Sequence, residues 1–219
     1  MSSAIIQLLV LAGIAVFLIL RLRSVLGTRE GFEKPPVPLP DQQRRSAPDL
    51  EVIEGGPDRD ITDHVDDGSD AARALAAMKL VEPSFNVGEF LQGARGAYEM
   101  ILMAFEKGDI ESIAPFLGDD VHQTFVDVIG EREDQGLTID AHFVGVRELT
   151  LTRASFDRDS QEAEVTVRFV GELTSTVRDS NGEIVEGDPN KIKRQKDSWT
   201  FARVMGMDDP NWKLVATGE

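Results

Sequence analysis

The spacing of apolar residues changes from a helical to a strand period near Gly136, and this change most limits the fold. Between Phe90 and Phe105 apolar side chains recur every three or four residues, which predicts an amphipathic helix. Between Glu164 and Arg178 polar and apolar residues alternate, which predicts a long strand with one buried face. Helices followed by strands predict an α+β fold, with the helices covering one face of a curved antiparallel sheet.

Three helices are predicted ahead of the strands. Ser84 can cap the first helix, and Gly108 supplies its stop. Asp109 then caps a short second helix (IESIAPFL), and Asp119 or Asp120 opens the third. The apolar face expected for the third helix consists of Val121, Phe125, Val128 and Ile129.

Four or five antiparallel strands are predicted after the helices. The first, at residues 143–156, joins the long alternating strand through the turn DRDSQ. Asn181-Gly182 is a strong signal for a hairpin turn. The remaining strands are expected at residues 183–193, 198–207 and 212–217, the last two separated by the turn DDPN.

The first 26 residues contain the densest apolar block of the chain. From Ala4 to Leu20 the sequence AIIQLLVLAGIAVFLIL carries no charge and, as a helix, would span about 26 Å, near the lower limit for a bilayer core. A cleaved signal peptide, the main alternative, would need basic residues before this run, and none precede it. Arg21 and Arg23 follow the run and place the downstream chain in the cytoplasm. We expect a single-pass anchor at residues 1–26 in the inner (cytoplasmic) membrane, with the N-terminus outside.

Residues 27–82 are acidic and rich in proline, and we expect them to form a flexible linker to a domain at residues 83–219. The acidic run DRDITDHVDDGSD does not fit a calcium loop, because Val65 and Ala74 would occupy ligand positions. A solvated acidic run is therefore expected. The sequence DAARALAAMKLV predicts a short helix over residues 70–81, which could dock on the domain or on a partner.

Composition and charge exclude several classes of function. The chain contains no cysteine, which excludes disulfides, thiolate metal sites and cysteine nucleophiles. The net charge is -16, and residues 83–219 hold 14 basic against 26 acidic side chains, so nucleic-acid binding is not expected. The three histidines lack metal-site spacing and phosphate-cradling glycine loops are absent, so we expect no metal and no cofactor.

Both ends of the region 83–219 resemble the Tim-forty-four-like domain family. In the first half the matching residues are Phe90, Gly93, Ala94, Tyr98, Ile101, Ala104, Phe105, Gly108, Asp109, Val121, Phe125 and Gly136. In the terminal sequence WTFARVMGMDDPNWKLVATGE they are Trp199, Phe201, Arg203, Pro210, Asn211, Trp212 and Leu214. The family includes an adaptor of the mitochondrial import motor and bacterial membrane-anchored TimA-type proteins, which the anchor and tether also resemble.

The resemblance implies a fold related to nuclear transport factor two-like domains, with a large apolar pocket between helices and sheet. It also implies a non-enzymatic adaptor or scaffold. Its expected partner is a protein of the translocation or chaperone machinery, with a lipid or acyl chain in the pocket as the other possibility. Gly93 and Gly96 are expected to permit close backbone packing of the first helix. The candidate pocket or core lining is Tyr98, Ile101, Leu102, Phe105, Phe125, Phe169, Trp199 and Trp212.

An enzyme of the ketosteroid-isomerase-like class is the alternative, because related pocketed folds place an acid or base inside the cavity. The best candidates are Asp140 and His142, which lie two apart on one side of a strand, with His122 on the third helix. Their position near a helix-to-strand junction favours an ordinary surface role, so no catalytic residue is assigned.

The basic run KIKRQK at residues 191–196 stands out in an acidic domain. We expect a solvated strand edge or loop there. A contact with lipid headgroups or with a partner is the alternative.

Overall fold

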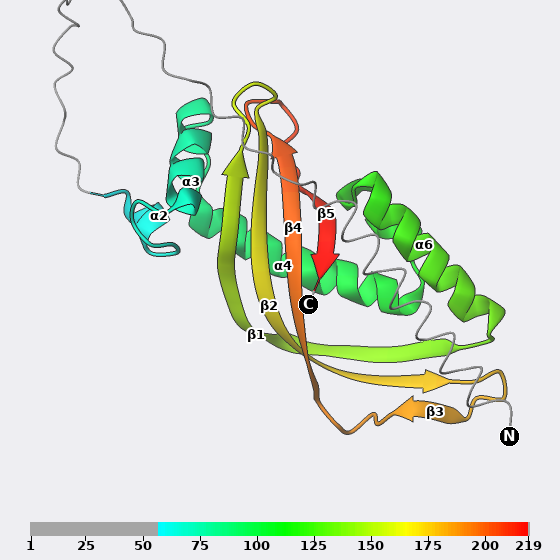
Figure 1. Ribbon diagram of the computed structural model, residues 1–219. Helices are drawn as coiled ribbons and strands as arrows, with labels where there is room; N and C mark the ends of the chain where they lie inside the picture. The colour runs from blue at the N-terminus through cyan, green and yellow to red at the C-terminus, as the bar shows by residue number, and fades with distance from the viewer. Residues whose placement is uncertain (1–56, 219) are drawn as a thin grey trace, which may run out of the picture. The chain divides into compact units, whose positions relative to one another are not determined.

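The computed structural model describes residues 57–218, in which helices precede strands (Figure 1). The helices are α2 (Arg59–Thr62), α3 (Asp70–Val81), α4 (Val87–Lys107), α5 (Ile110–Ile113), the 3-10 helix η1 (Ala114–Phe116) and α6 (Asp119–Asp134). The strands are β1 (Thr138–Phe156), β2 (Glu162–Arg178), β3 (Ile184–Gly187), β4 (Lys193–Val204) and β5 (Lys213–Gly218). This order confirms the α+β prediction.

The predicted membrane anchor at residues 1–26, including Arg21 and Arg23, lies outside the described residues, and so does the predicted linker up to residue 56. Within residues 57–218 no helix combines the length and the apolar character needed to cross a membrane. The sequence GARGAYEMILMAFEKGD at residues 93–109 falls mostly within α4, which is a helix of the domain.

The signals at the helix ends are partly those predicted. Asn86, not Ser84, caps α4, because its side chain accepts a hydrogen bond from the Glu89 amide at 2.8 Å. Gly108 ends α4 in the left-handed conformation, as expected from a glycine stop. Asp119 is the first residue of α6, as predicted, but Val128 is exposed rather than part of the buried face.

All strands of the sheet are antiparallel, in the order β1-β2-β4-β5. The short strand β3 pairs with the C-terminal end of β2, at residues 176–178. The sequence predicted the alternating strand β2 and the hairpin after it. It placed a single strand at residues 183–193, but there the turn Asp188-Pro189-Asn190 ends β3 and separates it from β4. β1 begins earlier than predicted, at Thr138.

The sheet bends sharply midway along β1 and β2 (Figure 1). The pairing of these two strands shifts register at three places, between Phe143 and Gly145, between Val146 and Glu148, and between Leu151 and Arg153. Such bulges increase twist and bend a strand locally. One part of the bent sheet contains most of β4 and β5, and the other contains β3, which pairs with the C-terminal end of β2.

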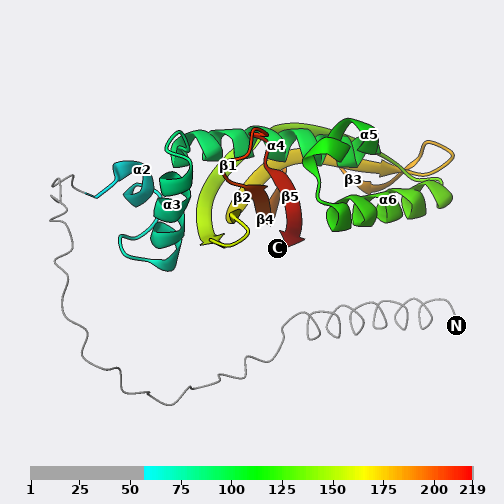
Figure 2. The ribbon, with the colours of Figure 1, turned by 90° about the horizontal axis from the view of Figure 1, so that it is seen from above.

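Helix α4 runs along one face of the sheet (Figure 2) and supplies most of the helical core. A single cluster of buried residues joins α4 to the inward-facing side chains of β2 and β4. Its largest fully buried members include Tyr98, Ile101, Phe169 and Phe201.

The expected domain boundary at residue 83 differs from the packing. Helices α2 and α3 lie within the expected linker, yet Ile61, Leu75 and Met78 are buried in the same core as α4 and the sheet. The helix predicted over residues 70–81 is confirmed as α3, and of its two expected docking places the structure shows the domain. Only α2 had no counterpart in the sequence prediction. The described domain therefore includes residues upstream of 83.

Candidate functional site

A groove of about 510 Å³ lies along one side of α4, and we call it the α4 groove. It is bounded by the α3–α4 connection, by η1, by the end of β4 and by the turn that leads to β5. Its lining residues are Glu82, Ser84, Phe85, Asn86, Glu89, Phe90, Gly93, Ala94, Gly96, Ala97, Met100, Ile101, Phe116, Phe201, Arg203, Pro210, Asn211 and Trp212.

Two glycines leave the α4 groove open. A Cβ atom added to Gly93 or Gly96 would meet no other atom within 4 Å. The predicted close backbone packing at these glycines is therefore wrong. Because glycine is unfavourable in a helix interior by about 1 kcal/mol relative to alanine, the helix gives up stability at two positions where a side chain would have room.

Aromatic side chains form the wall at the N-terminal end of α4. The ring of Phe90 lies 4.7 Å from that of Trp212 and 6.1 Å from that of Phe201, centroid to centroid. The Phe85 ring lies 5.9 Å from Trp212. These distances are in the range of favourable aromatic pairs, so the wall is a connected apolar surface drawn from three separate segments of the chain.

One ion pair lies inside this largely apolar lining. The Arg203 guanidinium pairs with the Glu82 carboxylate, donates to the Pro210 carbonyl at 3.1 Å and stacks 5.4 Å from the centre of the Trp212 ring. Burial would raise the pKa of Glu82, but the hydrogen bonds from Arg203 and the Gly206 amide outweigh it and hold this pKa below its ordinary value. The pair fixes the turn that carries Trp212 against the α3–α4 connection.

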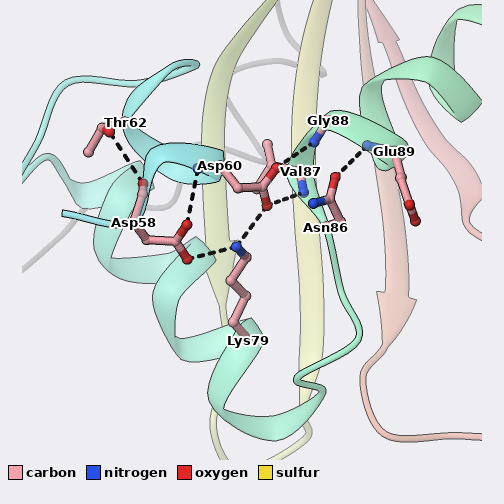
Figure 3. A network of polar contacts seen from close by, with 8 residues as sticks. All are labelled: Asp58, Asp60, Thr62, Lys79, Asn86, Val87, Gly88 and Glu89. Atoms are coloured by element: carbon pink, nitrogen blue, oxygen red, sulfur yellow. Dashed lines mark hydrogen bonds and ion pairs between the residues drawn. The ribbon is translucent and has the colours of Figure 1, made fainter. Parts of the chain in front are cut away.

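A polar network holds the end of the groove where α4 begins (Figure 3). The Asp60 carboxylate accepts hydrogen bonds from the amides of Val87, at 2.7 Å, and Gly88, at 3.0 Å. Lys79 of α3 pairs with both Asp58 and Asp60 at 2.7 Å. Two free amides of the first turn of α4 are thus satisfied by a carboxylate from α2.

The electrostatics of this network follow from its partners. Burial would raise the pKa of Asp60, but the hydrogen bonds from Lys79 and the two amides lower it below its ordinary value. Burial likewise opposes the charge of Lys79, yet the two aspartates raise its pKa. The prediction of a solvated acidic run is therefore wrong for Asp60, whose side chain is only 19% exposed.

The interior between α4 and the sheet is filled around Tyr98. Its ring stacks on Phe169 at 4.4 Å, with 9° between the ring planes, and lies 4.7 Å from Trp199. Its hydroxyl donates a hydrogen bond to Asp197, and burial together with this carboxylate raises the pKa of Tyr98. A Cβ atom at Gly171 would lie 2.6 Å from the Tyr98 hydroxyl oxygen, so this strand glycine makes room for the ring.

The eight predicted lining residues therefore separate into two groups. Ile101 and Trp212 line the α4 groove. The other six belong to the hydrophobic core or pack against it: Tyr98, Leu102, Phe105, Phe125, Phe169 and Trp199. Phe85, Met100 and Phe116 also line the groove, but the sequence did not single them out. In sequence, an apolar residue that lines a groove looks the same as one that packs in the core.

Asp140 and His142 lie exposed on one face of β1, and neither lines the α4 groove. Their register partners on β2 are Thr176 and Thr174. His122 lies half-buried on α6. Acid-base catalysis needs a buried acid or base that faces a cavity, and none of these three residues lines the groove.

Comparison with known proteins supplies relatives over much of the chain. A subunit of the Arabidopsis thaliana mitochondrial import inner membrane translocase, TIM44-1, is 23% identical over 152 residues, which are 67% of this chain and 32% of the relative. The Homo sapiens translocase subunit TIM44 is 23% identical over 167 residues, 72% of this chain and 36% of the relative. The chain thus spans about a third of the length of these relatives.

Among solved structures, the intermembrane space region of the chloroplast protein ARC6 aligns with 58% of this chain and 94% of its own, at 14% identity and a TM-score of 0.39. The sequence model of the Tim44-like domain family matches residues 71–219, which include α3 as well as the helices and strands after it. The chain belongs to the Tim44-like domain family.

Proposed function

We propose that this protein is a non-enzymatic adaptor of a protein-translocation or membrane-protein-assembly system, held at the inner membrane by residues 1–26. Two facts about the chain support the role. Its family is that of two relatives named as import translocase subunits, and its first 26 residues have the composition of a membrane span.

The partner is a protein that inserts apolar side chains into the α4 groove. The observation that carries this proposal is the open space over Gly93 and Gly96, on a helix whose opposite side is closely packed. A concave, mostly aromatic surface with a few fixed polar groups is typical of binding sites. The exposed side chain of Met100 adds a flexible apolar contact that suits variable partner side chains.

Site-specific photocrosslinking in intact membranes tests this proposal. A photoreactive amino acid at Met100 should crosslink to a protein partner, whereas one at Val126, equally exposed on α6, should not. A Cβ atom at Gly93 has no other atom within 4 Å, so Gly93→Leu should place its side chain in the groove. The variant should remove the Met100 crosslink and leave the thermal unfolding midpoint unchanged or higher.

The same experiment separates the lipid alternative. If the Met100 probe captures lipid rather than protein, and Gly93→Leu removes that lipid, then the groove is a lipid site and the partner proposal is wrong. Equal protein crosslinks from positions 100 and 126 would also contradict it, because they would report no preference for the groove.

The membrane topology has its own test, which the absence of cysteine makes clean. A membrane-impermeant maleimide should label Ser3→Cys in intact spheroplasts. It should label Asn181→Cys, in the exposed hairpin turn, only after the membrane is permeabilised. The reverse pattern would place the domain outside.

A further inference from the structure

The edge of the sheet at the start of β4 has no partner strand among the described residues. On one side β4 pairs with β2 along its whole length, but on the other side β5 covers only Ser198–Ala202. Residues 193–197 are therefore an open edge, which the free side of β3 extends (Figure 1). Such an edge presents unpaired amide and carbonyl groups that can accept another strand.

This edge is basic in a domain that is otherwise acidic. Lys191, Lys193, Arg194 and Lys196 are exposed and stand within six residues, although residues 83–219 hold 14 basic and 26 acidic side chains in all. Arg194 pairs with Glu172 on β2 at 2.9 Å. The acidic groups nearby are Asp197 in the same segment, which accepts the Tyr98 hydroxyl hydrogen bond, Glu106 near Lys193, and Glu186 and Asp188 at the end of β3 and in the turn after it. Residues 191–197 still hold four basic side chains against one acidic side chain.

Aliphatic side chains accompany the charges. Ile192 is 53% exposed, and on β3 Val185 is 56% and Ile184 44% exposed. A single exposed aliphatic residue is ordinary on a protein surface, but three beside one open edge form a contact surface for the side chains of an added strand.

We propose that this edge binds an acidic, extended segment of a partner protein, which pairs with residues 193–197 as an additional strand. The main chain of the edge supplies hydrogen bonds, and the lysines select the partner by charge. The same lysines repel a second copy of this edge, so they permit an acidic strand while discouraging self-association. This site is separate from the α4 groove and does not depend on it.

The test measures peptide binding to the full-length protein in neutral lipid nanodiscs by fluorescence anisotropy. The probe is a short acetylated peptide of alternating glutamate and valine. A peptide of alternating lysine and valine controls for charge, and a glutamate–valine peptide with two central valines replaced by proline controls for strand pairing. We expect binding of the first peptide only, weakened by added salt.

The variant Lys193→Glu with Lys196→Glu should weaken binding about tenfold or more, since two attractive contacts become repulsive. The matched control, Arg153→Glu with Arg158→Glu, changes the net charge equally at exposed positions next to α3 and should change the affinity by less than about twofold. Circular dichroism checks that both variants fold.

Three outcomes would overturn the proposal. Equal binding of the proline-containing peptide would show charge attraction without strand addition. An equal loss in the Arg153/Arg158 variant would show a general effect of net charge. Binding to phosphatidylglycerol vesicles that requires Lys193 and Lys196, with no peptide binding, would assign the edge to a lipid surface instead.

Discussion

The two sides of α4 differ in packing although they belong to one helix. On the side that faces the sheet, Tyr98 and Leu102 are buried, and the Tyr98 ring stacks on Phe169. The ring packs so closely on β2 that Gly171 has no room for a side chain. On the groove side, Gly93 and Gly96 have open space where side chains would fit. The first side stabilises the fold, and the second leaves a surface that is open to the proposed protein partner. An added methyl group should therefore destabilise the protein on the sheet side and stabilise it on the groove side, and a charge introduced on the sheet side should cost more.

Leu102→Asp should have the largest effect, because it places an unpaired carboxylate among buried apolar side chains. We expect a loss of at least about 4 kcal/mol in the free energy of unfolding, measured by urea denaturation of the purified protein. Met100→Asp, on the groove side of the same helix, should cost less than about 1 kcal/mol. Similar losses for the two variants would remove the distinction between the two sides.

Gly171→Ala should come next. The added Cβ would approach the Tyr98 hydroxyl oxygen to 2.6 Å, and the stacked ring has little room to move away. Overpacking of this kind costs about 1–3 kcal/mol, to be read from the shift in denaturation midpoint. The double variant Gly171→Ala with Tyr98→Phe removes the crowded oxygen and should recover part of the loss. A neutral Gly171→Ala would show that the ring is free to shift.

Asp60→Asn should lower the stability by about 1–2 kcal/mol at neutral pH, because Lys79 loses a charged partner and two amides lose a carboxylate cap. The pKa of Asp60 is lowered in the folded protein, so its contribution is present above the ordinary value of 3.8 and is lost as the pH falls below it. The difference between wild type and variant should therefore shrink as the pH falls from 5 towards 2. A difference that stays constant would assign the effect to shape and not to charge.

Gly96→Ala should have the smallest effect and the opposite sign. With no atom near the new Cβ, the variant gains helix propensity and should stabilise the protein by about 0.5–1 kcal/mol. Thermal unfolding measures this rise, with Gly171→Ala as the contrasting glycine. A destabilised Gly96→Ala would mean that the groove is narrower than the structure shows.

The elements that sequence predicted well are those with a regular local pattern. The alternation in β2 and the stop at Gly108 depend on neighbouring residues only, and the structure confirms both. β1 was harder to delimit because its three register shifts interrupt the two-residue period. The split between β3 and β4 depends on a turn that contains Pro189, within a stretch that otherwise suits a strand.

The candidate site was less predictable because it depends on distant parts of the chain. Glycines such as Gly93 fit close packing and open space equally well in sequence, and only the surrounding atoms distinguish the two. The wall formed by Phe90 and Trp212 joins segments more than a hundred residues apart. The Asp60 side chain accepts a hydrogen bond from the Val87 amide, 27 residues further along the chain, and patterns of neighbouring residues do not predict such a contact.

The network around Asp60 also determines how mechanical load enters the domain. Any pull on the chain upstream of residue 57 first meets the contacts of Asp58 and Asp60 with Lys79, Val87 and Gly88. These contacts join α2 to α3 through Lys79 and join α2 to the first turn of α4 through Val87 and Gly88, at one end of the groove. If residues 1–26 anchor the chain as proposed, tension from the membrane would therefore reach the first turn of α4 through Asp60.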